Sequence, residues 1–163
     1  MKRLFMTLIC GCLVLFTSNC TTQNDDLIWD IYPLVFSFEI VDDGGKNLLD
    51  ENTSGNILSD DIMIIYDRTE FHLGVDMDGI YPSKAYMPYM YGLYVSDKKL
   101  KFGEFDGSED LSGYFIIAWG DGTYDEIEFD YDFEWGSSTP YSTRTVYHNK
   151  EKVSNPSLIT IVR

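Results

Sequence analysis

Apolar and acidic residues alternate without a break through residues 126–133, just after an Asp-Gly pair at residues 121–122. A period of two places successive side chains on opposite faces of a β-strand. Asp-Gly supports the positive backbone angles that tight hairpin turns need. The segment therefore predicts a hairpin whose second strand has one face toward a core and the other toward water. The inward residues are Ile127, Phe129, Tyr131 and Phe133, and the outward residues are Glu126, Glu128, Asp130 and Asp132.

Short runs of the same kind recur along the chain and are separated by Gly, Asp, Asn and Pro. Residues 62–66 form an apolar run suited to a strand covered on both faces, and residues 114–119 are apolar on both faces, which predicts a central strand. Further strands are expected at 34–41, 69–73, 89–96, 100–105, 141–148 and 157–162, with turns at Asp67-Arg68 and, joining the last two strands, at Asn149-Lys150. The predicted fold class is all-β, a two-layer antiparallel β-sandwich of immunoglobulin-like type with about 7–9 strands.

The first 19 residues have the layout of a secretory signal peptide. Lys2 and Arg3 precede an apolar run over residues 4–16, which is followed by small polar residues. As a helix, this run would reach only about 20 Å, short of a hydrocarbon core of about 30 Å. It is therefore interpreted as a targeting segment and not as a membrane span.

Cys20 stands where the apolar run has passed into a polar, acidic segment. This pattern looks like the bacterial lipoprotein signal, which implies that Cys20 is acylated and becomes the new amino terminus. Thr17 and Asn19 depart from the Leu and the Gly or Ala that this signal usually carries. Cys12, within Ile9-Cys10-Gly11-Cys12, is a better local match but leaves a shorter apolar run. In a third reading, the cysteines are incidental and cleavage is ordinary.

Cleavage before Cys20 leaves 144 of the 163 residues, without another cysteine. The exported domain then has no intramolecular disulfide and depends on its packed core. A chain of about 150 residues buries roughly 68–70% of its unfolded surface, so one domain suffices. The expected organisation is a lipoprotein signal peptide at 1–19, a lipidated N-terminus and tether at 20–30, and a β-sandwich domain at 31–163.

The charge is strongly acidic. All 27 acidic residues remain after cleavage against 10 basic ones, which gives a formal charge of −17. Such a chain is repelled by nucleic-acid phosphates and by anionic headgroups, so no nucleic-acid partner is expected. Membrane attachment is expected through the lipid on Cys20. The acidity can also serve solubility alone.

The segments NLLDENTSGNIL, KFGEFDG, IAWGDGTYDEIEF and NPSLITIVR resemble a family of small, uncharacterised lipoproteins of Bacteroidetes. The resemblance implies one β-sandwich behind a lipidated cysteine, located in the cell envelope and attached to the outer membrane. It brings no catalytic residue. In lipoproteins of this type, acidic residues after the cysteine are associated with surface display, and Asp25 and Asp26 fit that pattern.

No catalytic motif is recognised. His72 and His148 each fall in a predicted strand, without metal-ligand spacing, and a structural role is the simpler reading. No G-x-S-x-G segment presents a nucleophile. Glu126 and Glu128 are about 7 Å apart along a strand, a separation that an inverting glycosidase can use but that every alternating strand shares. The chain is expected not to be an enzyme, with glycoside hydrolysis as the alternative, and no cofactor is expected.

Two acidic patterns have double readings. Asp42, Asp43, Asp50 and Glu51 flank a Gly-rich turn and could bind calcium, although the spacing departs from an EF-hand loop and turn-forming hydrogen bonds explain them equally. The outward carboxylates of residues 126–132 can gather cations, or can keep sheets from pairing edge to edge.

The segment YPSKAYMPYMYGLY, residues 81–94, contains five tyrosines. Exposed tyrosines stack on sugar rings or anchor protein partners, whereas alternation over residues 89–95 is ordinary core patterning. The candidate ligand-binding residues are therefore Tyr81, Tyr86 and Met87. The sequence predicts a lipid-anchored envelope protein acting as a non-catalytic binding or structural module, with a glycan or a protein as its ligand and glycan hydrolysis or calcium binding as alternatives.

Overall fold

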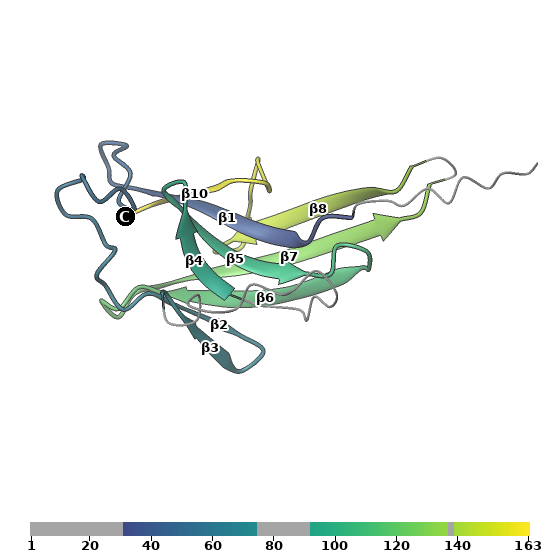
Figure 1. Ribbon diagram of the computed structural model, residues 1–163, viewed down its shortest axis with the longest axis horizontal. Helices are drawn as coiled ribbons and strands as arrows, with labels where there is room; N and C mark the ends of the chain where they lie inside the picture. Colours follow the sequence, from purple (N-terminus) through teal and green to yellow (C-terminus); the bar gives the residue numbers. More distant parts are fainter. Residues whose placement is uncertain (1–30, 75–91, 137–138) are drawn as a thin grey trace, which may run out of the picture. The chain divides into compact units, whose positions relative to one another are not determined.

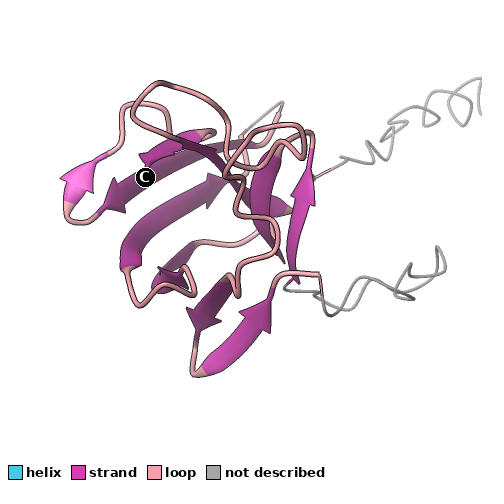
Figure 2. Ribbon diagram, turned by 90° about the vertical axis from the view of Figure 1, so that its left-hand side faces the viewer, coloured by secondary structure: helices cyan, strands magenta, loops and turns pink. Residues whose placement is uncertain are grey.

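The computed structural model describes residues 31–74, 92–136 and 139–163, and all regular structure in these ranges is β-strand (Figure 2). The strands form a four-stranded and a six-stranded sheet that pack as a sandwich around one core (Figure 1). The predicted all-β, two-layer sandwich is confirmed, with ten strands in the described ranges. They are β1 (Leu34–Val41), β2 (Met63–Tyr66), β3 (Thr69–His72), β4 (Gly92–Ser96), β5 (Lys99–Phe105), β6 (Leu111–Ala118), β7 (Tyr124–Glu134), β8 (Tyr141–His148), β9 (Glu151–Lys152) and β10 (Ile159–Val162).

The strand order is β10-β1-β5-β4 in the first sheet and β3-β2-β6-β7-β8-β9 in the second. Neighbours pair antiparallel except β1 and β10, which run parallel with Phe38 opposite Ile159 and Ile40 opposite Ile161. In the second sheet, β6, β7, β8 and β9 follow one another as a meander. The long strands β6, β7 and β8 therefore form the middle of one layer.

The predicted pairing of the last two strands is wrong. Around Asn149-Lys150 the chain turns from β8 into the short β9, whereas β10 crosses to the other sheet and lies beside β1. The burial of β10 explains the crossing: Ile159 and Ile161 are 1% and 2% exposed and fill the core from the opposite layer. Burial of those side chains outweighs the local preference for a longer hairpin.

Aliphatic and aromatic side chains share the core, and eight of its 21 buried residues in the described ranges are aromatic. Leu34, Phe36, Phe38 and Ile40 of β1 are buried, as their alternation predicted. The Phe36 ring centroid lies 5.2 Å from that of Phe115 and 4.7 Å from that of Phe129, both in the opposite sheet. Burying such a ring stabilises the fold by about 1.5–3 kcal/mol, and each ring pair adds about 0.5–1.5 kcal/mol.

Strands β6 and β7 show how the inner and outer faces of the six-stranded sheet differ. On β7, Ile127, Phe129 and Tyr131 are buried and Phe133 is partly buried, while Glu128, Asp130 and Asp132 are exposed and Glu126 is half-buried; the predicted faces are confirmed. Strand β6 lies between β2 and β7, so it is internal to its sheet as predicted. Its outer face is only partly covered, because Ile116 and Ala118 are half-buried and Tyr114 is 62% exposed.

The outer face of β2 is similar: Ile64 is buried, but Met63 and Ile65 are half-buried. Tight turns set the register of three hairpins, with positive φ at both residues of Asp67-Arg68, Asp97-Lys98 and Asn149-Lys150. That conformation matches the twist of the flanking strands. The described ranges contain no helix long and apolar enough to span a bilayer.

Candidate functional site

The residues predicted for lipidation and ligand recognition, Cys20, Tyr81, Tyr86 and Met87, lie outside the described residues. They stay predictions.

The acidic turns near residues 42–51 use their carboxylates for local hydrogen bonds. Asp42 Oδ1 accepts the backbone N–H groups of Gly44 at 2.9 Å and Lys46 at 2.8 Å. Asp50 binds Lys98 at 2.6 Å, and this hydrogen bond, with those from Asn52, lowers the pKa of Asp50 to about 2. Within the described ranges, no group of three His, Cys, Asp or Glu side chains is arranged to hold a metal ion. The geometry of these turns fits the turn-forming alternative.

The two histidines differ in their surroundings. His72 lies on the edge strand β3, with its ring nitrogens 3.3 Å from Asp61 and 3.6 Å from Glu70. Its side chain is 37% exposed, and the two acidic side chains are largely exposed. His148, the last residue of β8, lies with Nε2 2.7 Å from Asp125 Oδ1 in a partly buried position. His148 therefore belongs to a more closely packed group.

That group is the Asp125 cluster, formed by Trp119, Asp125, His148 and Asn149. Trp119 Nε1 donates to Asp125 Oδ2 at 2.7 Å, and Asn149 Nδ2 donates to Oδ1 at 2.7 Å. Trp119 is 2% exposed, and the Asp125 side chain is 14% exposed. Three side chains thus converge on the carboxylate of Asp125 in β7. Trp119 follows β6, His148 ends β8 and Asn149 follows β8.

The strand registers explain this convergence. Asp125 is two residues before Ile127, so it points to the inner side of its sheet, where β6 places Ile117 opposite it. Ile127 itself pairs with His148. Trp119 continues the inward alternation of β6. The inward side chains at this end of the sandwich therefore meet, and the first of them on β7 is acidic.

Two opposing effects act on the Asp125 carboxyl. Burial raises its pKa, but hydrogen bonds from His148, Trp119 and Asn149 together outweigh burial and hold the pKa below its ordinary value of 3.8. Asp125 is therefore ionised at neutral pH. It can accept hydrogen bonds from a ligand but does not act as a general acid there.

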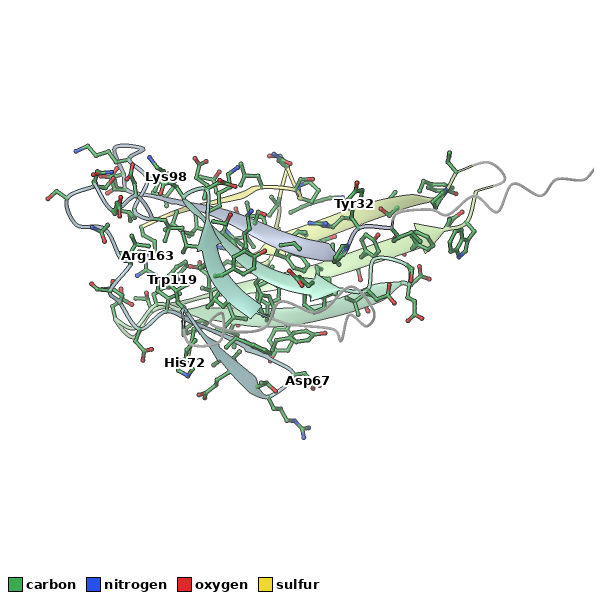
Figure 3. All side chains as sticks on the ribbon, in the orientation of Figure 1. Tyr32, Asp67, His72, Lys98, Trp119 and Arg163 are labelled. Atoms are coloured by element: carbon green, nitrogen blue, oxygen red, sulfur yellow. The ribbon has the colours of Figure 1, made fainter. Side chains whose placement is uncertain are left out.

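Arg163 lies beside the Asp125 cluster. Its Cζ is 4.4 Å from the centroid of the Trp119 ring, a cation–π contact, and Figure 3 shows the two residues adjacent at one end of the sandwich. Its Nη2 donates to Asp121 and, at 3.0 Å, to Thr123 Oγ1. Its backbone N–H donates to Val41 O at 2.8 Å. The guanidinium is held in place by the β6–β7 turn.

That turn is wider than the predicted tight turn. Asp121 Oδ1 accepts the backbone N–H of Thr123 at 2.8 Å and its hydroxyl at 2.6 Å, and Gly120 and Gly122 have φ of +79° and +87°. A Cβ on Gly120 would lie 3.0 Å from the backbone nitrogen of Asp61. Glycine is therefore needed at residue 120 both for the turn and because the backbone of Asp61 lies so close to it.

A pocket of about 440 Å³ opens next to these residues. We call it the Tyr124 pocket. Its apolar side is formed by Leu48, Ile57 and Val162, and its polar side by Thr123, Tyr124, Asp125 and Arg163. Tyr124 is 61% exposed, so most of its ring is available to a ligand. The lining thus includes a tyrosine, an ionised aspartate and an arginine. Of the guanidinium nitrogens of Arg163, only Nη2 donates to acceptors among the described residues.

The sequence did not single out the Tyr124 pocket, although one signal pointed to it. Strict alternation in β7 assigns residue 125 to the inward face, and an aspartate there needs partners. The carboxylates considered for glycosidase chemistry, Glu126 and Glu128, lie on the outer face of the sheet.

We compared the chain with protein-family models, curated proteins and solved structures, and no match was found. The resemblance to Bacteroidetes lipoproteins therefore stays a prediction.

Proposed function

We propose that this protein is a lipid-anchored module of the cell envelope that binds a glycan at the Tyr124 pocket without converting it. The observation that carries the proposal is a pocket lined by Tyr124, which is 61% exposed, and by the charged residues Asp125 and Arg163. Ligand sites typically have volumes of about 300–1,000 Å³, apolar and aromatic linings and a few placed polar groups. A pocket of about 440 Å³ falls in that range.

A sugar matches this lining in two ways. Its C–H face stacks on a flat ring such as that of Tyr124, and its hydroxyl groups both donate and accept hydrogen bonds. Asp125 supplies acceptors, and the free N–H groups of Arg163 supply donors that the Trp119 ring and Asp121 hold in position. Because these groups are already fixed, little conformational entropy is lost on binding.

Binding without conversion is supported by the protonation state of the pocket. A glycoside hydrolase needs one carboxylic acid with a raised pKa to protonate the leaving oxygen. Asp125 has a lowered pKa instead. Retention at the membrane is supported by the sequence alone, through the signal peptide and Cys20, because several acyl chains anchor stably where one is marginal.

The test is a glycan array with the full-length protein purified from its membrane fraction. Tyr124→Ala should weaken binding about ten-fold through loss of the stacking ring, with an unchanged melting temperature. Tyr114→Ala is the matched control, because Tyr114 does not line the pocket and is 62% exposed, against 61% for Tyr124. Equal binding by both variants would refute the pocket, and shortening of a glycan during incubation would favour the hydrolase alternative.

The same array tests the predicted recognition residues, since Tyr86→Ala weakens binding only if that segment contributes. Anchoring is tested separately by fractionating cells that carry wild-type protein or Cys20→Ala. The wild-type protein should remain with membranes and the variant should not. Protease treatment of intact cells then distinguishes surface display from a periplasmic location.

A further inference from the structure

The outer face of the six-stranded sheet carries an ordered row of aromatic and acidic side chains. Glu128 in β7 lies opposite Tyr114 in β6 on one side and opposite Tyr147 in β8 on the other. Glu126 and Asp130 lie on the same face of β7, two residues before and after Glu128. We call these five residues the acidic sheet face. Two tyrosine rings thus flank one carboxylate at the distance of directly paired residues, about 4.5–5.5 Å between Cβ atoms.

The carboxylates of the acidic sheet face have no cationic partner in the described ranges. None of Glu126, Glu128 and Asp130 forms an ion pair there. Along the row of paired residues, the nearest basic residue is Lys152 on β9. Lys152 is paired with Tyr147, so Tyr147 lies between Lys152 and Glu128. Glu128, Asp130 and Tyr114 are exposed, so a partner can reach them.

Protection of a sheet edge does not explain the row. Strand β7 pairs with β6 on one side and β8 on the other, so it is internal and has no free edge to protect (Figure 1). Apolar residues continue the same face on the neighbouring strands, where Ile116 lies between Ile65 and Glu126. The face therefore combines half-buried apolar surface, one exposed and one half-buried tyrosine, and unpaired negative charge.

We propose that the acidic sheet face docks an extended segment of a protein partner with Lys or Arg at alternate positions. Carboxylates two residues apart on β7 repeat at about 7 Å, the repeat of alternate side chains in an extended peptide. Each basic side chain then meets a carboxylate, and the central one also lies between the rings of Tyr114 and Tyr147, which attract cations through their faces. The formal charge of −15 favours such a partner at long range.

The probe is a fluorescein-labelled peptide in which Lys and Thr alternate, and its anisotropy is measured against the full-length protein. A peptide of the same composition with all Lys residues at one end is the comparison. The alternating peptide should bind more tightly. Glu128→Gln should weaken its binding about five-fold, the effect of roughly 1 kcal/mol at an exposed ion pair. Tyr114→Ala should weaken it as well.

Two controls make the result specific. Glu51→Gln removes an exposed carboxylate from a loop, and Tyr32→Ala removes a tyrosine that is 81% exposed and lies outside the six-stranded sheet; both variants should bind the peptide as the wild type does. Equal weakening by Glu51→Gln and Glu128→Gln, or equal binding of the two peptides, would overturn the proposal. Because Tyr114→Ala should weaken peptide binding but not glycan binding, either site can fail without the other.

Discussion

Replacing Asp125 by asparagine tests whether its carboxylate organises the end of the sandwich. The substitution keeps the size and shape of the side chain but exchanges one acceptor oxygen for an NH₂ group. In the wild type, Oδ2 accepts from Trp119, and Oδ1 accepts from Asn149 and lies 2.7 Å from His148 Nε2. Whichever way the amide turns, its N–H groups face another donor.

The magnitude follows from these contacts. If the NH₂ group faces the indole, the Trp119 N–H loses its acceptor in a residue that is 2% exposed. A buried donor without a partner costs about 1–3 kcal/mol, and a hydrogen bond to a charged group contributes about 1.5–3 kcal/mol. Because the contacts share one carboxylate they do not add fully, and we expect a loss of about 2–4 kcal/mol. Against a total stability of about 5–15 kcal/mol, this is a large fraction.

Urea unfolding at pH 7, followed by circular dichroism, measures the loss. Asp130→Asn is the matched control, since it makes the same change at an exposed position of the same strand and should alter stability by less than about 0.5 kcal/mol. Equal effects of the two substitutions would refute the reasoning.

The pH dependence gives a second check. Hydrogen bonds hold the pKa of folded Asp125 below 3.8, so its contribution is present above that pH and is lost as the pH falls through the folded pKa. The difference in the free energy of unfolding between wild type and Asp125→Asn should therefore be fully present at pH 7 and shrink below pH 3.8.

Three further substitutions test other parts of the fold. Lys150→Gly should stabilise the fold by about 0.5–1 kcal/mol and so raise the melting temperature, because residue 150 has φ of +72° and Asn-Gly suits such a turn. A lower melting temperature than that of the wild type would contradict this. Tyr131→Phe should cost about 1–2 kcal/mol in urea unfolding, because its buried hydroxyl donates to Gly107 O at 2.8 Å, and no loss would count against that bond. Gly103→Ala should cost about 3 kcal/mol or reduce soluble yield, because φ is +124° and a Cβ would lie 2.8 Å from a backbone oxygen. Near-normal stability would contradict this and would show that the backbone of β5 shifts to make room.

Individual strands were predictable where one local pattern dominates. The bounds of β1 and β8 agree with the alternation of their residues, and the inward side of β7 follows from the same rule. The Asp67-Arg68 turn was also predicted, because its polar residues separate two apolar runs. In each case the deciding contacts lie within a few residues along the chain.

Partners distant in sequence were not predictable in this way. Residues 141–148 and 157–162 look like consecutive hairpin strands, yet β10 joins β1 in the other sheet. Asp125 is 23 residues from His148, and Arg163 is 40 residues from Thr123. The inward position of Asp125 signalled that it needs partners, but alternation does not say which strand ends supply them.

The sequence by itself determined the strands β1, β7 and β8, which of their side chains face inward, and the turns at Asp67-Arg68 and Asn149-Lys150, because periodicity and turn chemistry act between near neighbours. Only the tertiary structure decided that Trp119, His148 and Asn149 meet at Asp125, and that the acidic row of β7 lies inside a sheet. These outcomes depend on which strands pair, and pairing is chosen by burial of apolar surface shared among segments far apart in the chain.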